Sequence, residues 1–525
     1  MRQNSNSNTQ QIHRAVLTGF LMVASIILAR FAFMNGTPVF GLAIPGILIV
    51  SLLLERPWLI FICVLAASEA MVRIPGFPDA LGGREVFEIF LIGWAVLDIA
   101  MRKRKACFSY DTSIDVWMVL FFINVIFIMA VTGVGFRVQG QSSYGGSVYL
   151  GLLAAIGFYF SAVKLTFTEK QLKIMIWGVL VAAAIPAGLQ FVVYFNPAME
   201  PLLTRYITIN TEYFMLEQAG PSDAVRWNQL SGFSFALVTV AYVLCKQRTI
   251  RAILLIWSFL MMGLTGFRSR VFRLSMLTFF ASICFSKHRA KTVLLWLLIG
   301  LAGVGFIALA STKLPLSIQR VLSDIPGVKV DATVARVAKL SGDWRFNMWK
   351  DYCIPNVPKH LLIGRGVVSD ITSFSWLQSS WYGSAEFAYH MHAYHSGPFS
   401  LLLDFGLFGT VAFTLFFLLV IKDGWRTARR YASLRDDTIS KYYIFLVVVM
   451  TYELFGYFFV FGSVPTALPR MLVEAAMLRI LKKNFLMESP SVTGTQSIKP
   501  AQDALLKPFK SVKPVNNQWA KSGLR

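Results

Sequence analysis

The sequence predicts an all-α polytopic membrane protein with about 12–14 transmembrane helices and one large helical loop. Hydrophobic residues make up 56% of the 525 residues and charged residues only 15%, and the mean hydropathy is +0.59. A soluble domain needs more charge than this to cover its surface. Alternating strand patterns are rare, which disfavours a transmembrane barrel.

Apolar runs near the length that crosses a hydrocarbon core of about 30 Å recur along almost the entire chain. They are expected at residues 15–34, 38–54, 58–72, 86–101, 115–135, 147–163, 172–195, 230–245, 251–265, 271–286, 292–311, 397–421, 441–462 and 469–482. The polar start of the chain precedes a run that we interpret as a retained membrane helix, because no small-residue cleavage site follows it.

Basic short loops predict the orientation of these helices. Lys and Arg collect in "RKRK" at 102–105 and in the segments 164–173, 246–251, 287–291 and 422–430. Counting crossings from a cytoplasmic N-terminus puts all of them in the cytoplasm, as the positive-inside rule requires. The net charge of +23 is therefore explained by the cytoplasmic loops that orient the helices. We do not expect nucleic-acid binding, because the sequence contains no basic soluble domain.

This orientation divides the chain into five parts. They are a cytoplasmic tail (1–12), a transmembrane bundle (13–312), a periplasmic cap loop (313–396), C-terminal transmembrane helices (397–486) and a disordered cytoplasmic tail (487–525). The cap contains "LPLSIQRVLSDI" and "ATVARVAKLSGDWRFNMWKDY", whose helical apolar spacing predicts helices along the membrane interface that roof a cavity.

Arginines stand on the external face, where the orientation rule places few basic residues. They are Arg226, Arg268, Arg270 and Arg345. Any one of them could snorkel or bind a lipid headgroup. A cluster of guanidinium groups, which offer planar forks of donors, instead suits a lipid-linked phosphate or pyrophosphate.

Three of the six histidines lie within "YHMHAYHSGPFSL" at 389–401. A neutral imidazole can remove a hydroxyl proton, and His395, beside the membrane, is the candidate for this role. For His390 and His392 the alternatives are ordinary loop polarity, acceptor contact or a metal site. No HExxH-like pattern surrounds them, and the five scattered cysteines form no CxxC pair. We expect neither a metal nor a cofactor.

Acids within the apolar segments support a different class of function, a transporter or flippase with a proton relay. They are Glu69, Glu88, Asp98, Asp404 and Glu453. No pair of matching broken helices marks an inverted repeat.

From Trp227 to Val420 the chain resembles the bacterial O-antigen ligase and polymerase superfamily. "HSGPFSLLLDFGLFG" matches the family's His-Asn and Gly-Leu-x-Gly pattern, with His395 at the histidine, Ser396 in place of Asn, and Gly406 to Gly409 at the glycine motif. "LTGFRSR" resembles its Thr-x-Ser-Arg turn, with Arg268 at the arginine and Arg270 as the competing assignment. "WRFNMWKDYCIPNVPKHLLIGRG" resembles its Arg-x-x-x-Trp segment and its glycine stretch, and thus places Arg345, Trp349, Gly364 and Gly366.

The resemblance implies an inner-membrane glycosyltransferase of the all-helical C type that works without a metal. Such an enzyme moves a glycan from an undecaprenyl-pyrophosphate carrier to an acceptor hydroxyl at the periplasmic face. By that analogy His395, Arg345 and Arg268 are catalytic, while Arg226, Arg270, Trp349 and His392 bind substrate. The acceptor is lipid A-core for a ligase and another lipid-linked glycan for a polymerase, and a protein-glycosylating enzyme is a third option. The partners are then donor, acceptor and membrane lipids.

Overall fold

In the computed structural model the chain divides into two units, Met1–Phe485 and Leu486–Arg525. Apart from a few single residues, the structure describes residues 55–70, 82–102, 111–135, 143–204, 227–314, 316–323, 327–370 and 385–487. The predicted runs at 15–34 and 38–54, both predicted tails except Met487, and Arg226 lie outside these residues.

The described part of the chain is built from helices, as the hydropathy predicts. Each of the twelve remaining apolar runs coincides with one helix: α3 (Pro57–Ala70), α4 (Gly83–Arg102), α5 (Thr112–Thr132), α6 (Gly146–Ala162), α7 (Glu169–Phe195), α10 (Leu230–Val243), α11 (Arg248–Leu264), α12 (Arg268–Phe285), α13 (Arg289–Ala310), α18 (Gly397–Arg430), α19 (Thr438–Phe459) and α20 (Val464–Met487). The cap adds the longer helix α15 (Ala332–Met348). Short helical segments complete the described helical elements: the 3-10 turns Pro197–Met199, Ser311–Lys313 and Ala432–Leu434, α8 (Glu200–Leu203), α14 (Leu316–Leu322), the π-helical turn Trp349–Cys353, α16 (Ile354–His360) and α17 (Ala385–His390).

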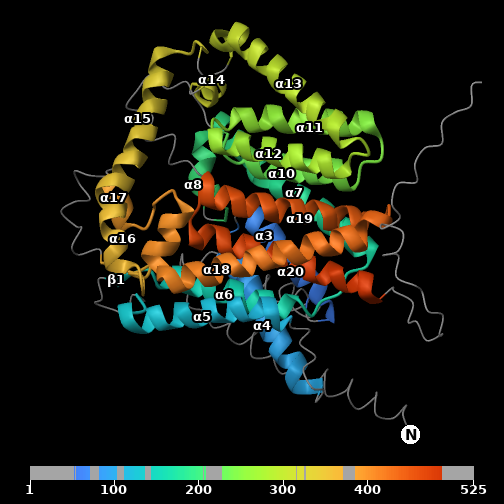
Figure 1. Cartoon of the computed structure of the whole chain (residues 1–525), viewed down its shortest axis with the longest axis vertical. Helices are drawn as coiled ribbons and strands as arrows, with labels where there is room; N and C mark the ends of the chain where they lie inside the picture. The colour runs from blue at the N-terminus through green and yellow to red at the C-terminus, as the bar shows by residue number, and fades with distance from the viewer. Residues whose placement is uncertain are drawn as a thin grey trace, which may run out of the picture. The chain divides into compact units, whose positions relative to one another are not determined.

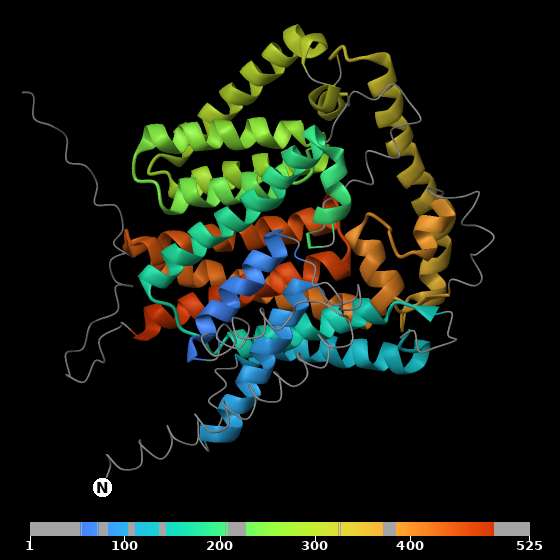
Figure 2. The ribbon, with the colours of Figure 1, turned by 180° about the vertical axis from the view of Figure 1, so that it is seen from behind.

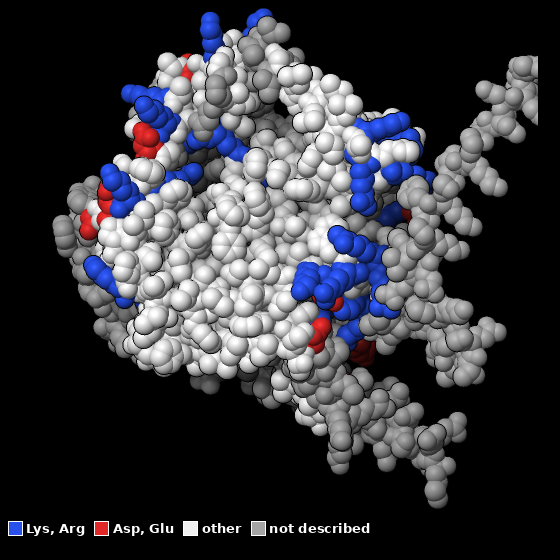
Figure 3. All heavy atoms as spheres, in the orientation of Figure 1, with Lys and Arg blue, Asp and Glu red and all other residues white. Residues whose placement is uncertain are grey.

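Four of the described helices, α5, α7, α18 and α19, are long and apolar enough to cross a membrane, and α3, α6 and α10 are shorter apolar helices. On the face shown in Figure 3, charged side chains gather on two opposite sides, and the surface between them is almost free of charge. An uncharged band between two charged rims is what a lipid bilayer requires. The protein is an all-α polytopic membrane protein.

The bundle helices pack around one large apolar core, to which α18 contributes Phe405, Phe413, Phe416 and Phe417. Polar contacts at one end of the bundle join segments from several helices. The hydroxyl of Thr438 donates to Glu169 at 2.7 Å, and Nζ of Lys482 lies 2.7 Å from Asp423. The basic segments 164–173 and 422–430 therefore share one end of the bundle, as the alternation of predicted crossings requires.

The cap loop is folded into helices, as predicted. In both ribbon views α15 runs across the ends of the bundle helices (Figures 1 and 2). Asp331 caps α15 by accepting hydrogen bonds from the backbone N–H groups of Thr333 and Val334. A second apolar cluster, which includes Met348, Tyr394 and Leu403, joins α15 to the segment that leads into α18.

One short strand pair stands apart from the helical prediction. Strand β1 (Ser143–Tyr144) pairs in antiparallel fashion with β2 (Ser369–Asp370). Two residues per strand carry no apolar alternation that a sequence could reveal. The pair ties the start of α6 to the segment that follows the glycine stretch of the cap.

Candidate active site

Arg268 is the first residue of α12, and the preceding turn brings it to the cap. Gly266 has a φ of 69°, which favours glycine, and the backbone N–H of Phe267 donates to the hydroxyl of Thr265. Nη2 of Arg268 donates to the carbonyl of Ala338 on α15 at 3.4 Å. The side chain thus reaches from the bundle to the cap helix.

Arg270 points to different partners. Its Nη1 donates to the carbonyl of Asn228 at 2.8 Å and to the hydroxyl of Ser231 at 3.1 Å. Its guanidinium lies 4.3 Å from the ring centroid of Phe267. These contacts tie α12 to the start of α10. The two competing arginines thus have different partners, and Arg268 is the one that contacts α15.

His395 lies at the end of the cap, two residues before α18, and is flanked by two aromatic rings. Its ring centroid is 5.5 Å from that of Trp344 on α15 and 5.1 Å from that of Phe461, which follows α19. Burial, together with the positive charge of Arg345, lowers the pKa of His395 to about 4. The imidazole is therefore neutral at ordinary pH.

Two polar nitrogens of these aromatic side chains are unpaired in the part of the chain that the structure describes. Nδ1 of His395 and Nε1 of Trp344 are buried and have no hydrogen-bond partner among the described residues. Buried polar atoms in proteins are almost always paired, so such a site is one where a ligand or water can complete the bonding.

Arg345 links the two sides of the site. It lies in the last turn of α15, next to Trp344, and its charge acts on both His395 and Arg268. Two guanidinium groups and one neutral imidazole thus come together from α12, α15 and the segment that precedes α18. This arrangement can bind an anion and accept a proton beside it.

The other histidines of the cluster do not gather with His395. His392 directs Nδ1 at Oδ1 of Asp404, 2.7 Å away, and His390 packs beside the ring of Tyr389. Within the described ranges no group of three or more His, Cys, Asp or Glu side chains is placed to hold a metal ion.

Trp349, which the resemblance assigns to substrate binding, contacts the protein itself. Its Nε1 donates to the carbonyl of Tyr394 at 2.7 Å, and its ring lies 6.2 Å from that of Phe399. The residue joins the cap helix to the turn that carries His395.

The two glycine motifs meet in space. Gly406, with φ 68° and ψ −176°, interrupts the helical backbone of α18, and Gly364 has a φ of 87°. The backbone N–H of Arg365 donates to the carbonyl of Leu403 at 2.7 Å, and that of Gly366 donates to the carbonyl of Asp404 at 3.0 Å. A Cβ at Gly364 would meet the backbone at Asp404, so only glycine allows this approach.

A comparison of the sequence with protein families finds one match that covers these residues. Residues 252–414 match the model of a family described as O-antigen ligase. The chain carries an O-antigen ligase domain. The matched segment contains Arg268, Arg345 and His395, so the resemblance to the O-antigen ligase and polymerase superfamily is confirmed there. No curated protein matches the chain.

Sequence reasoning missed one buried cluster within the O-antigen ligase domain. Arg365, Tyr394 and Asp404 form a set of hydrogen bonds around His392. In the sequence Asp404 stands out only as an acid inside an apolar run. The position of Arg365 between Gly364 and Gly366, in the glycine stretch, was the available signal.

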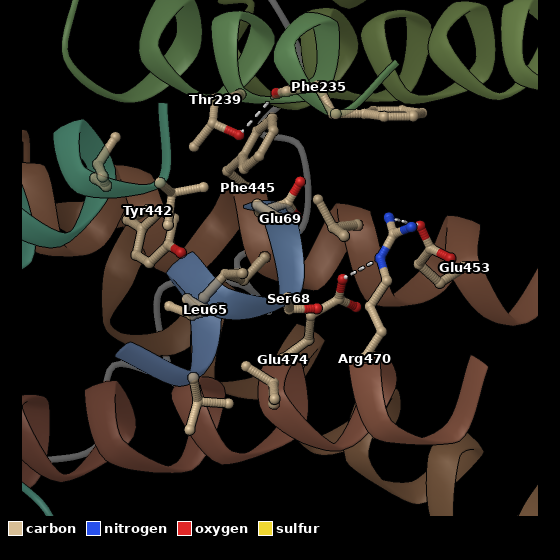
Figure 4. Close-up of a pocket in the computed structure, with 18 of the residues that line it drawn as sticks. Leu65, Ser68, Glu69, Phe235, Thr239, Tyr442, Phe445, Glu453, Arg470 and Glu474 are labelled. Atoms are coloured by element: carbon tan, nitrogen blue, oxygen red, sulfur yellow. Dashed lines mark hydrogen bonds and ion pairs between the residues drawn. The ribbon is translucent and has the colours of Figure 1, made fainter. Parts of the chain in front are cut away.

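A cavity of about 140 Å³ lies among α3, α7, α10, α19 and α20, and two acids of the transporter hypothesis, Glu69 and Glu453, line it. Arg470 reaches between Glu453 and Glu474, with Glu69 in the same wall (Figure 4). Glu453 also pairs with Arg273 on α12, and Nε of Arg84 lies 3.5 Å from Glu88. Each of these pairs places a carboxylate against an arginine, as structural ion pairs inside a membrane require.

Proposed function

We propose that this protein transfers a glycan from a polyprenyl-pyrophosphate carrier, undecaprenyl pyrophosphate in bacteria, to an acceptor hydroxyl. The observation that carries the proposal is the convergence of Arg268, Arg345 and His395 within the matched O-antigen ligase domain. Three segments distant in sequence supply two cations and one neutral base to one place.

The two arginines bind the diphosphate of the donor. Guanidinium groups stay charged at all working pH values and offer paired donors to phosphate oxygens. As the bond between the anomeric carbon and the phosphate oxygen breaks, the electron pair stays on the diphosphate, whose charge grows. Arg268 and Arg345 stabilise that growing charge, which is where an electrostatic contribution to catalysis is largest.

His395 accepts the proton of the acceptor. The acceptor oxygen forms a bond to the anomeric carbon as the diphosphate leaves, and its proton moves to the imidazole. Attack opposite the leaving group inverts the anomeric configuration, and no covalent enzyme intermediate is needed. In this mechanism the two arginines stabilise the negative charge of the diphosphate, a role that a metal ion has in other phosphate-binding sites.

The site faces the periplasm in this proposal. The basic segments 164–173 and 422–430 lie at one end of the bundle, and the cap helix α15 crosses the other (Figures 1 and 2). Orientation by basic loops then puts the cap outside the inner membrane. A cysteine introduced at the exposed Lys339 should react with an impermeant maleimide added to intact spheroplasts. Protection of that cysteine until the membrane is permeabilised would contradict the periplasmic assignment.

Reconstitution tests the reaction itself. The full chain in liposomes is given undecaprenyl-pyrophosphate-linked glycan and, in separate samples, lipid A-core, a second lipid-linked glycan, or an acceptor protein. We expect a product of increased mass with one acceptor, which then distinguishes ligase, polymerase and protein-glycosylating activity. Intact donor in all samples, with a correctly inserted protein, would refute the proposal.

A further inference from the structure

The turn that presents His395 has a backbone that other residues must hold in place. His392 and His395 have φ values of 58° and 55°, and they are the non-glycine residues with positive φ in the described part of the chain. The left-handed region is uncommon for residues with a Cβ and persists when the surrounding contacts fix it.

Asp404 supplies these contacts from α18. Asp404 is fully buried, and its carboxylate oxygen Oδ1 accepts a hydrogen bond from the hydroxyl of Tyr394 at 2.6 Å. The same oxygen lies 2.7 Å from Nδ1 of His392. Tyr394 immediately precedes His395, so a single carboxylate fixes two residues of the turn.

Arg365 compensates the charge of this buried carboxylate. Its Nε donates to the hydroxyl of Tyr394 at 2.9 Å and lies 3.6 Å from Oδ1 of Asp404. Its Nη2 donates to the carbonyl of Tyr389, and the guanidinium lies 4.1 Å from the ring centroid of Tyr389. Arg365 therefore contacts both ends of the turn, and the carboxylate is not left as an isolated buried charge.

The same turn is joined to the helix that carries Arg345. Trp349 follows Arg345 by one helical turn and donates from Nε1 to the carbonyl of Tyr394 at 2.7 Å. A displacement of the turn would therefore move His395 relative to both Trp344 and Arg345.

We propose that Asp404 is a positioning residue of the transfer reaction. Through Tyr394 and His392 it holds the 389–395 turn in the conformation that presents His395 beside Arg345. Asp404 is too deeply buried to touch the substrate, so its effect reaches the reaction only through the turn. The proposal rests on the proposed function, because it assigns Asp404 to the reaction in which His395 takes part.

The test compares Asp404→Asn with a matched variant of the same helix, Asp423→Asn. Asp423 is a partly buried carboxylate that pairs with Lys482 at 2.7 Å near the other end of α18. In proteoliposomes we expect Asp404→Asn to lower kcat by about 10- to 100-fold, the usual cost of losing a residue that orients a catalytic group. KM for the donor should stay within about threefold, since Arg268 and Arg345 remain. Asp423→Asn should leave both constants unchanged.

A second measurement does not depend on transfer. The pKa of His395 is followed by NMR of histidine-labelled full-length protein, with the resonance assigned from His395→Gln. Loss of positioning releases His395 from its buried place near Arg345, so its pKa should rise from about 4 toward the ordinary value of about 6.5. A variant that is merely less stable lowers the folded fraction without moving this pKa.

The outcomes separate the two proposals. A wild-type kcat in Asp404→Asn, or an unmoved pKa of His395, overturns the positioning role. If Asp404→Asn does not accumulate in the membrane, Tyr394→Phe removes only the hydroxyl and carries the same two expectations. A wild-type protein that transfers no glycan refutes the proposed function, while the pKa of His395 still decides whether Asp404 fixes the turn.

Discussion

The ring of His395 lies 5.5 Å from the ring of Trp344, and each ring carries a buried nitrogen that no described residue pairs. One ring comes from the cap helix and the other from the segment that enters α18. The two rings therefore contact each other while their nitrogens keep unused hydrogen-bonding capacity, which suits the binding of a polar substrate.

Trp344→Phe tests this interpretation, since it keeps an aromatic ring and removes Nε1. We expect transfer to fall by about tenfold, because a hydrogen bond to the bound substrate of roughly 1.4 kcal/mol is lost. The temperature of unfolding in detergent should stay the same or rise, since a buried unpaired donor disappears. A large fall in that temperature with unchanged transfer would mean that Trp344 serves only packing.

Arg268 and Arg270 should respond differently to the same conservative change. Arg268→Lys keeps the charge but loses the paired donors, so we expect kcat/KM for the donor to fall about 100-fold, or about 2.7 kcal/mol. Arg270→Lys should instead lower the unfolding temperature, because the bonds to Asn228 and Ser231 are lost. Donor kinetics and thermal unfolding of both variants provide the measurement. The reverse assignment of the two phenotypes would make Arg270 the functional arginine.

The pH dependence of transfer should reflect the low pKa of His395. A group whose pKa lies at about 4 is neutral throughout the range from pH 7 to pH 5, so the base stays available there. We expect kcat to remain nearly constant over this range and to fall only as the pH approaches 4. A fall in kcat centred near pH 6.5 would show that the base is an imidazole with an ordinary pKa.

Glu453→Gln tests whether the charged cavity has a structural role or takes part in transport. The glutamate pairs with Arg273 of α12 and Arg470 of α20, and its loss leaves two arginines of the bundle without that carboxylate. We expect the unfolding temperature to fall by several degrees, because removing one partner of a buried ion pair is destabilising. Glycan transfer per folded molecule should persist. Loss of a proton-driven flux in liposomes, with normal stability, would instead support the transporter hypothesis.

Hydropathy alone located every described bundle helix, because a segment that crosses a membrane must be apolar and must satisfy its own backbone. Arg268, Arg345 and His395 could also be selected from the sequence, since each lies at an end of an apolar run or within the cap. Their order along the chain matched a known pattern.

The contacts of Asp404 could not be predicted in this way. Arg365 and Asp404 are separated by the cap segment that folds back on α18, and their contact depends on the backbone at Gly364 and Gly406. An acid inside an apolar run is equally consistent with a proton relay and with one half of a structural ion pair. Similarly, no local signal separates Arg268 from Arg270, because the difference lies in which neighbouring helix each side chain reaches.

The most direct test of the central claim is the rate of glycan transfer by wild-type protein and by His395→Ala, measured in proteoliposomes at equal folded protein. His390→Ala is the matched control, because it removes a histidine of the same segment that packs beside Tyr389. We expect transfer by the wild type and by His390→Ala, and a loss of at least about 100-fold in His395→Ala. Equal rates in all three proteins would contradict the assignment of His395 as the proton acceptor and, with it, the site built on Arg268 and Arg345.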